Sequence, residues 1–218
     1  MRQFGWRPEE DARDESYTLR ALAMPDVTER EWWADGWHGD QGATPECVAY
    51  ALLHHLNDGP DPYTLFNVRR PGMVPRELYC DARDRDPWPK PCDAHAGTSL
   101  RAGAKALKAR GFITRYEWLR TLPDITAYVL GTGALVLGTH WFEGMSRPDA
   151  DGVIRIAGGL LGGHAYVLNG INVDSGFARV KNSWGRGWGM GGHAFLPLED
   201  LERLTGLVWL GEVMAVKY

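Results

Sequence analysis

Residues 162–185 read GGHAYVLNGINVDSGFARVKNSWG. Two runs of apolar residues, 162–174 and 177–184, are separated by the turn-forming residues NVDSG, and this pattern predicts an antiparallel β-hairpin. His164 lies near the start of the first strand and Asn182 near the end of the second. The hairpin would therefore bring their side chains together across the sheet.

The rest of the chain predicts helices first and strands later. Helical periodicity runs from Thr44 to about Arg120, whereas short apolar runs punctuated by glycine fill the chain from about Ile125 onward. We expect an α+β fold in which helices precede an antiparallel sheet. The expected helices are 44–58, 74–86 and 99–111, and the other expected strands are 134–141, 192–198 and 209–218.

Composition excludes several classes of protein. The chain has 218 residues, with 24 basic and 28 acidic side chains and no basic tract, so nothing favours binding to nucleic acid or to an anionic membrane. No apolar run approaches the length of a membrane span, and the charged N-terminus does not resemble a signal peptide. We expect a cytoplasmic monomer with no cofactor and no metal site.

Two expectations concern local features. Cys80 and Cys92 are close enough in sequence to pair, but a reducing compartment favours free thiols. His54 and His55 end the helix 44–58, where an imidazolium suits the negative end of the helix dipole, so we expect both at the surface.

Cys47 lies in the first turn of the helix expected at 44–58, with Thr44 as the N-cap and Pro45 at the first helical position. Unpaired backbone N–H groups and the helix dipole favour a thiolate there, as a cysteine nucleophile requires. A structural cysteine in the core explains the same position, and position alone favours that interpretation.

Three other residues supply the chemistry that a nucleophilic cysteine needs. His164 has the imidazole that takes the thiol proton, and Asn182 has the amide that fixes the tautomer and orientation of that ring. Gln41 precedes the helix, where its side-chain amide and the Cys47 backbone N–H can bind the oxyanion of a tetrahedral intermediate. This combination favours the nucleophile interpretation.

With these residues in this order, the chain resembles the papain-like cysteine peptidase family. The spacing from Gln41 to Cys47 and the sequence His164-Ala165 match the family pattern, and the Asn-Ser-Trp-Gly signature is intact at 182–185. The resemblance covers about residues 25 to 215. It is nearest to compact bacterial-type members that lack a long propeptide.

The resemblance implies a two-lobe fold with the active-site cleft between the lobes. Residues 40–125 would form a helical lobe that carries the nucleophile, and residues 126–218 an antiparallel, β-barrel-like lobe that carries the histidine and asparagine. Residues 1–39 would cross to the sheet lobe. Removal, docking over the cleft and binding to a partner all remain open for the first thirty residues, so an inhibitory N-terminal segment or a partner protein is expected to regulate the enzyme.

The function implied is a cysteine-type peptidase that hydrolyses peptide or isopeptide bonds of peptide or protein substrates through a thioester. Gly163, Ala165 and Trp184 would line the substrate site, and the Trp184 ring would shield the hydrogen bond between His164 and Asn182 from water. A cell-wall amidase, an acyl transferase and a catalytically weak peptide-binding module remain as alternatives.

The chain departs from the family pattern near the nucleophile. Glu46 precedes Cys47, where its charge opposes a thiolate unless it pairs with a cation or turns to solvent. Thr44 replaces the family's second cysteine, so the usual bridge to the active-site loop cannot form. The family's substrate-pairing Cys-x-Gly-Gly segment has no counterpart, and the segment PCDAHAGTS around Gly97 is the candidate to replace it.

Overall fold

The computed structural model describes residues 2–20, 22–32, 37–58, 74–88, 91–92, 96–206 and 211–217. The helices are the 3-10 helix η1 (Ala12–Tyr17), α1 (Cys47–Asp58), α3 (Pro75–Arg83), α4 (Leu100–Ala109), α5 (Leu122–Gly131), the 3-10 helix η3 (Glu143–Met145) and α6 (Leu198–Thr205). The strands are β1 (Glu29–Glu31), β2 (Arg115–Leu119), β3 (Leu135–Phe142), β4 (Leu160–Asn172), β5 (Phe177–Lys181), β6 (His193–Pro197) and β7 (Gly211–Lys217).

One antiparallel sheet contains all the described strands, in the order β2-β7-β3-β4-β5-β6, and β1 pairs with β4 outside this path. The expected hairpin is present as β4 and β5, in register from Asn172 opposite Phe177 to Val167 opposite Lys181. A bulge between Leu168 and Gly170 interrupts that register. The prediction of an α+β fold with an antiparallel sheet is confirmed.

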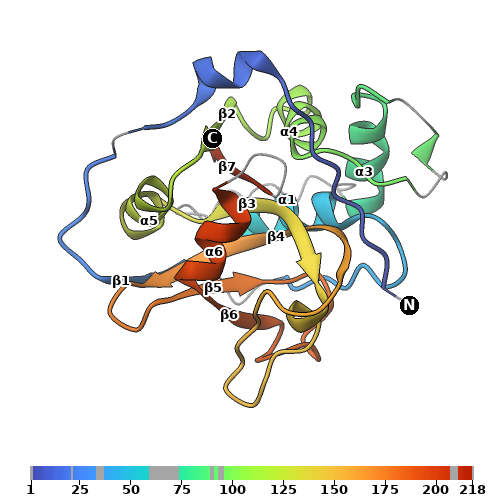
Figure 1. The fold of residues 1–218 in the computed structure, drawn as a ribbon. Coiled ribbons are helices and arrows are strands. Elements are labelled where there is room, and N and C mark those ends of the chain that lie inside the picture. The colour runs from blue at the N-terminus through green and yellow to red at the C-terminus, as the bar shows by residue number, and fades with distance from the viewer. Residues whose placement is uncertain are drawn as a thin grey trace.

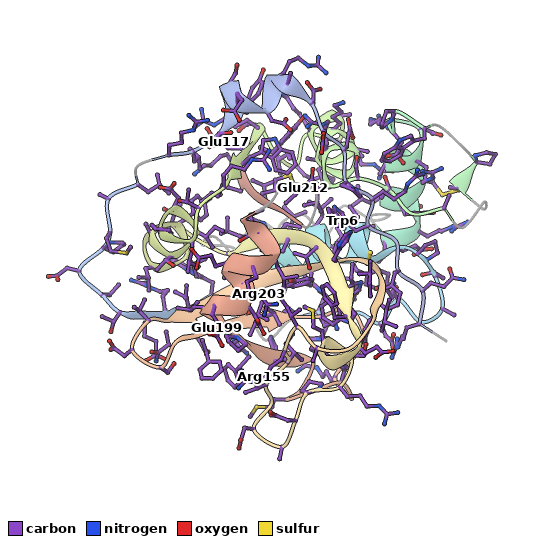
Figure 2. The ribbon with its side chains drawn as sticks, in the orientation of Figure 1. Trp6, Glu117, Arg155, Glu199, Arg203 and Glu212 are labelled. Atoms are coloured by element: carbon purple, nitrogen blue, oxygen red, sulfur yellow. A yellow bond between two sulfur atoms is a disulfide. The ribbon has the colours of Figure 1, made fainter. Side chains whose placement is uncertain are left out.

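Helices cover both faces of the sheet (Figure 1). On one face, α1, α3 and α4 pack against inward-facing residues of β3, β4 and β7, such as Val136 and Val167. On the other face, α5 and α6 pack against their alternating neighbours, such as Leu135 and Leu168. The sheet therefore separates two apolar cores, as the period-2 alternation of strand side chains requires. The polar side of α6, with Glu199 and Arg203, faces outward (Figure 2).

Helix α1 is buried on almost every side, because eleven of its twelve residues are buried and only Tyr50 is half-buried. It begins later than expected, at Cys47. Thr44 does not cap it: the Thr44 hydroxyl donates to the Gln41 carbonyl at 2.7 Å and so closes the loop that precedes the helix. Cys47 accordingly lies at the helix N-terminus.

The expected surface position of His54 and His55 is wrong. Both side chains are buried, at 0% and 1% exposure. His54 Nε2 accepts from the Gly39 N–H at 3.0 Å, and His55 Nε2 pairs with the Ala134 carbonyl at 2.8 Å. The end of α1 points into the protein against the sheet, so burial decides the environment of these rings and the helix dipole does not.

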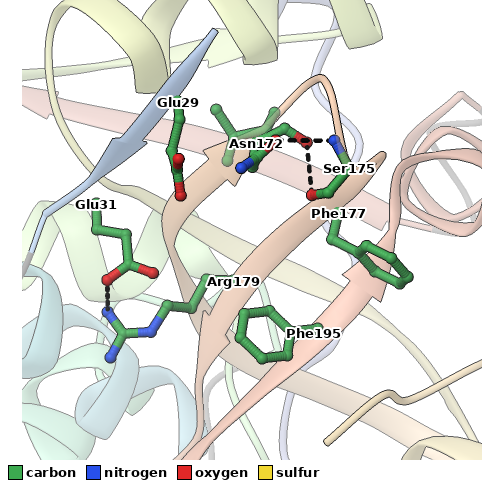
Figure 3. Close-up of a pocket in the computed structure, with 8 residues that line it drawn as sticks. Glu29, Glu31, Asn172, Ser175, Phe177, Arg179 and Phe195 are labelled. Carbon is green, nitrogen blue, oxygen red and sulfur yellow. Dashed lines mark hydrogen bonds and ion pairs between the residues drawn. The ribbon is translucent and has the colours of Figure 1, made fainter. Parts of the chain in front are cut away.

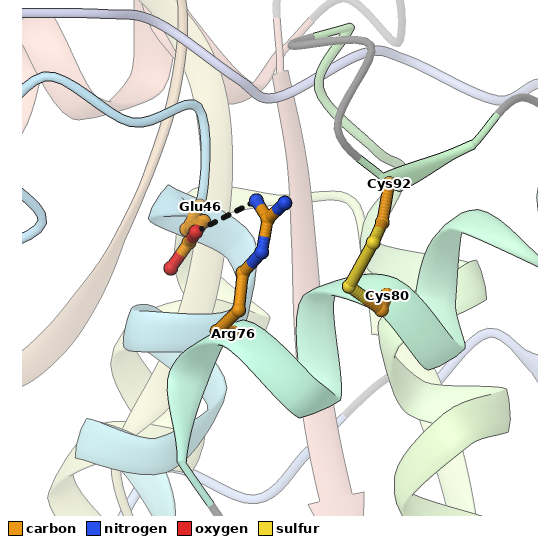
Figure 4. The surroundings of a disulfide bond; sticks show 4 residues. All are labelled: Glu46, Arg76, Cys80 and Cys92. Carbon is orange, nitrogen blue, oxygen red and sulfur yellow. Dashed lines mark hydrogen bonds and ion pairs between the residues drawn. A yellow bond between two sulfur atoms is a disulfide. The ribbon is translucent and has the colours of Figure 1, made fainter.

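The expectation that Cys80 and Cys92 are free thiols is also wrong, because they form a disulfide with a Cα–Cα separation of 4.8 Å (Figure 4). The chain turns back after α3 because the buried Arg83 guanidinium donates to Asp86 at 2.5 Å and to the Gly97 carbonyl at 2.7 Å. This turn brings Cys92 beside α3. The argument from a reducing compartment to free thiols therefore does not hold for this pair.

The N-terminal segment wraps around the molecule (Figure 1). It passes β4, where Trp6 N–H donates to the Gly163 carbonyl at 2.9 Å, then forms η1, and returns to the sheet as β1. The boundary expected at residue 125 does not coincide with the layers, since β2 pairs with β7 and α5 packs on the sheet. None of the described helices is long and apolar enough to cross a bilayer.

A buried ion pair joins α1 to the sheet and leads to a first prediction. Lys181 Nζ donates to Asp58 at 2.7 Å, with side-chain exposures of 3% and 0%. Replacing one partner leaves an uncompensated buried charge, so Asp58→Ala should lower the free energy of unfolding by about 3 kcal/mol at neutral pH. Urea unfolding measures this change. The exposed Asp151→Ala is the matched control, and equal losses in the two variants would contradict the expectation.

Candidate active site

A short hydrogen bond joins the two residues of the predicted histidine and asparagine pair. His164 Nε2 lies 2.8 Å from Asn182 Oδ1, and both side chains are fully buried. The same Oδ1 accepts from the Ser183 N–H at 2.7 Å, which fixes which end of the amide is oxygen. Because Oδ1 can only accept, His164 carries its proton on Nε2 and presents the Nδ1 lone pair on its other side.

Aromatic rings enclose His164. Its centroid lies 4.8 Å from that of Trp141, 5.0 Å from that of Trp184 and 5.9 Å from that of Phe4. Burial lowers the pKa of His164 to about 4, although the hydrogen bond that His164 donates to Asn182 acts in the opposite sense. The imidazole is therefore neutral at neutral pH. Because these rings also exclude water, they strengthen the hydrogen bond between His164 and Asn182.

Cys47 lies at the start of α1 and has no exposed surface. Burial raises the pKa of its thiol to about 11, against hydrogen bonds from backbone N–H groups, chiefly those of Ala165 and Gly5, that lower it. The Ala165 N–H lies near enough to lower this pKa, so the sulfur lies beside the residue that follows His164. Nδ1 of His164 has no hydrogen-bond partner among the described residues, so no bond joins it to the sulfur. In this state thiol and imidazole are both neutral.

Gln41 is held by three bonds at the turn before α1. Its Nε2 donates to the Thr44 carbonyl at 2.7 Å and to the Gln3 carbonyl at 3.1 Å, while its Oε1 accepts from Ser183 Oγ at 2.5 Å. The Gln41 N–H also donates to the Ser183 carbonyl at 2.8 Å. The loop of Gln41 is thus fastened to the loop of Asn182, and its amide faces a backbone carbonyl of the N-terminal segment.

Glu46 pairs with a cation, which is one of the two arrangements that relieve its repulsion of a thiolate. Its carboxylate lies 3.1 Å from Arg76 Nη1 of α3 and is 7% exposed (Figure 4). This pairing neutralises the charge next to Cys47.

Residues 3–7 lie across Cys47 and His164. Thr98 N–H donates to the Gly5 carbonyl at 2.7 Å, and Arg7 N–H donates to the Thr98 carbonyl at 3.0 Å. On the other side, Trp6 N–H donates to the Gly163 carbonyl at 2.9 Å. Thr98 belongs to the segment around Gly97 singled out above for backbone pairing with substrate, and it pairs here with an extended segment of the same chain.

The Trp6 side chain fills a pocket in the sheet layer and is 3% exposed. Its Nε1 donates to Glu212 Oε2 at 3.2 Å, and both side chains are buried (labelled in Figure 2). A Cβ on Gly138 would come within 2.2 Å of the indole, so only glycine leaves room for it. Burial raises the pKa of Glu212 to about 7, and the Trp6 N–H acts in the opposite sense.

Comparison with known proteins identifies the architecture. No family model matches the sequence. The crystal structure of xylellain, a cysteine protease from Xylella fastidiosa, superposes with a TM-score of 0.75 over 98% of this chain and 95% of its own, at 17% identity. The chain has the papain-like cysteine protease fold.

Other proteins support the same assignment. Procathepsin B from Trypanosoma congolense has a TM-score of 0.64 at 13% identity, over 98% of this chain and 86% of its own. Digestive procathepsin L 3 of the Tenebrio molitor larval midgut has a TM-score of 0.62 at 14% identity, over 94% and 75%. An uncharacterized peptidase C1-like protein of Acanthamoeba polyphaga mimivirus is 22% identical, over 78% of this chain and 68% of its own.

In this papain-like fold, an ionic cluster anchors the chain that follows Trp6. Arg101 of α4 is 5% exposed and lies 3.0 Å from Glu9 and 2.6 Å from Asp14. Trp118 Nε1 also donates to Asp14, at 2.9 Å. We call residues 2–14 the N-terminal strap. It is pinned at Arg101, and from that anchor it reaches back over Cys47.

Three histidines, the buried His54 and His193 and the half-buried His38, lie behind the Asn182 loop. The ring centroid of His38 is 5.3 Å from that of His54 and 5.5 Å from that of His193. Burial, together with nearby positive charge that includes Lys181, lowers the pKa of His38 to about 4 and that of His193 to about 3, and lowers that of His54. No group of three or more His, Cys, Asp or Glu side chains in the described part of the chain is arranged to hold a metal ion.

Several residues near Cys47 carried no signal in the sequence. Trp141 reaches His164 because β3 pairs with β4. Phe4 and Trp6 belong to a segment more than 150 residues before His164 in the sequence. Ser183 lies within the recognised Asn-Ser-Trp-Gly signature, yet its bond to Gln41 appears only in three dimensions.

The histidine cluster predicts acid sensitivity. Because the folded-state pKa values lie below the usual 6.5, the unfolded chain binds these protons first, and stability is lost as pH falls from about 6.5 toward about 4. Glu212 acts in the opposite sense between about 7 and 4.5, so the test compares variants. His54→Gln, which keeps an acceptor for Gly39, should remove on the order of 1–2 kcal/mol of the loss between about pH 7 and pH 5 in urea unfolding. An unchanged pH dependence would contradict this.

Proposed function

We propose that this protein is a cysteine peptidase that hydrolyses peptide or isopeptide bonds, with Cys47 as nucleophile, His164 as acid and base, and Asn182 as the residue that orients His164. The observation that carries this proposal is the bond from His164 Nε2 to Asn182 Oδ1, which turns the Nδ1 lone pair away from the amide. The position of Cys47 at the N-terminus of α1, beside Ala165, supports the role of its sulfur.

The reaction would proceed in two steps. Cys47 Sγ attacks the substrate carbonyl while its proton passes to His164 Nδ1, and the oxyanion is held by the Cys47 N–H and by Gln41 Nε2. The imidazolium then protonates the leaving amine, the C–N bond breaks, and a thioester remains on Cys47. In the second step, His164 takes a proton from water, the resulting attack breaks the thioester, and the carboxylic acid product and the thiol are released.

The bonds of Gln41 support its part in this scheme. Its Nε2 already donates to a backbone carbonyl, that of Gln3, so the amide points toward chain bound over the site. Ser183 Oγ holds the amide oxygen and thereby keeps the N–H₂ end turned the same way. Donors held in position before the reaction need little reorganisation when charge develops.

We also propose that the N-terminal strap inhibits the enzyme. Residues 3–7 occupy the backbone partners Thr98 and Gly163 that an extended substrate would use, and Cys47 has no exposed surface beneath them. The raised thiol pKa and the lowered imidazole pKa in this covered state keep the pair neutral. Burial is the largest cause of both pKa shifts. Uncovering the site would therefore favour the ion pair of a Cys47 thiolate and a His164 imidazolium. Two of the similar structures are procathepsins.

The catalytic assignment predicts a ranked loss of activity in protein lacking the strap. Cys47→Ala should abolish hydrolysis and His164→Ala should lower kcat by about 10²–10⁴, the worth of a positioned acid and base. Asn182→Ala should lower kcat about tenfold, because it removes one neutral hydrogen bond. Cleavage of a mixed peptide library, read by mass spectrometry, measures each loss. Equal losses for Asn182→Ala and His164→Ala would count against the ranking.

Labelling of the thiols and the same peptide library together separate the alternative functions. An epoxide directed at thiols should label only Cys47, since Cys80 and Cys92 are bonded to each other. Full activity of Cys47→Ala would refute the assignment. Transfer products without hydrolysis would indicate an acyl transferase, and binding without turnover would indicate a peptide-binding module.

The strap predicts that weakening its anchor in the pocket activates the enzyme. Trp6→Ala removes a buried indole, so hydrolysis and alkylation of Cys47 by iodoacetamide should both become about tenfold faster or more. Tyr17→Ala is the matched aromatic control, because Tyr17 lies on the same segment but is 56% exposed. If Trp6→Ala changes neither rate, the strap is not inhibitory.

A further inference from the structure

A hollow lies on the face of the sheet that carries α1, beyond the C-terminal end of that helix. It is a cavity of about 310 Å³ at the end of the sheet formed by β1, β4, β5 and β6 (Figure 3). Its size falls at the low end of cavities that bind small ligands, and it suits one long side chain.

The strand register explains why this hollow exists. Glu31, Gly170, Arg179 and Phe195 are successive partners across the four strands, so they form one row on one face. Gly170 contributes no side chain to that row. The Arg179 side chain therefore reaches over it to Glu31, at 3.2 Å, and the space beside them stays open.

The charges of the hollow favour a cation. Glu29 and Glu31 stand on the edge strand β1 and face it, whereas Arg179 is the basic side chain among the residues that line it. Arg179 is mostly buried, at 12% side-chain exposure, and its guanidinium is matched by Glu31. Glu29 is exposed and leaves one negative charge in excess on this wall.

Aromatic rings form the opposite wall. Phe177 and Phe195 are partly exposed, and their centroids lie 6.4 Å apart in an edge-to-face arrangement. Figure 3 shows the two carboxylates on one side of the hollow and the two rings on the other. A ring face attracts an ammonium or guanidinium group, and the ring edges accept its apolar stem.

We propose that this hollow, the β1–β6 pocket, binds an arginine or lysine side chain of a peptide or protein. The carboxylate of Glu29 meets the charged end of the side chain, and Phe177 and Phe195 meet its stem and its cationic face. An anionic ligand would face two carboxylates, and Arg179, the cationic side chain among the described residues that line the pocket, is already paired with Glu31.

The pocket is separate from the candidate active site. Helix α1 has Cys47 at one end and Asp58 at the other, and its twelve residues span about 18 Å. The pocket lies beyond the Asp58 end, near enough for the Asp58 carboxylate to act on Arg179. A protein held here by one basic side chain would make its contact roughly 20 Å or more from the sulfur. The pocket would thus add selectivity for a protein without touching the bond that is cleaved.

The test is a titration followed by backbone NMR in the full-length Cys47→Ala protein, so that binding is measured without turnover. The probes are N-acetylarginine methylamide, N-acetyllysine methylamide and the neutral isostere N-acetylcitrulline methylamide. The arginine and lysine probes should give saturable shift changes at residues 29–31 and 175–179, and citrulline should bind about tenfold more weakly. Glu29→Gln should weaken arginine binding about two- to fivefold, whereas Glu199→Gln, an exposed glutamate on α6, should leave it unchanged.

Three outcomes would overturn the proposal: no saturable shifts at these residues, equal binding of citrulline, or equal binding by Glu29→Gln. Phe177→Leu, which keeps an apolar side chain but removes the ring, should also weaken the arginine probe. Because the measurement uses a protein without its nucleophile, a failure here leaves the peptidase proposal standing. A failure of the peptidase proposal would likewise leave this binding intact.

Discussion

Helix α1 is packed so tightly on the sheet that its position fixes most of the site. Nearly every residue from Cys47 to Asp58 is buried, and Gly103 of α4 lets the two helices approach closely, since a Cβ there would come within 2.5 Å of Leu52. Pressed against β4, the N-terminus of α1 places Cys47 beside Ala165. The hydrogen bond of His164 to Asn182 then sets the ring orientation relative to that sulfur.

The packing of α1 forces polar groups into the interior, and the protein satisfies them with one another. Asp58 binds Lys181 and Asn169, and His55 binds the Ala134 carbonyl just before β3. Such groups stabilise a fold less than apolar residues of equal volume, but they accept few alternative arrangements. We infer that they hold the strand leading to Asn182 in register with the end of α1. Precision of the site then rests partly on charges far from the reacting atoms.

The sequence was sufficient to select the residues of the candidate site, because each of them stands in a local motif. Cys47, His164 and Asn182 each stand in a short pattern whose residues are neighbours in the chain, and the hairpin of β4 and β5 follows from turn residues. Other neighbours of His164 could not be predicted in the same way. Trp141 and Phe4 contact it only after the sheet has formed and the N-terminus has folded over it.

The errors have a common physical origin, since local rules were applied where tertiary contacts decide. The dipole argument for His54 and His55 ignored that the end of a helix can be buried. The two cysteines were judged by compartment, while the ion pair of Arg83 and Asp86 brings their backbones together. The short helices α5 and α6 were not predicted. The apolar run of α5 resembles a buried strand over so few residues, whereas α6 has leucines at helical spacing that were overlooked in a stretch of strands.

The anchoring of the strap at Arg101 has a kinetic consequence. Residues 3–7 remain attached beside the site even when they lift away, so their effective concentration is on the order of millimolar. Contacts that would be too weak for a free peptide are then enough to keep the site occupied. Cleavage of one peptide bond between residues 3–7 and the anchor at Arg101 would release residues 3–7 as a free peptide at low concentration. This release would not reverse.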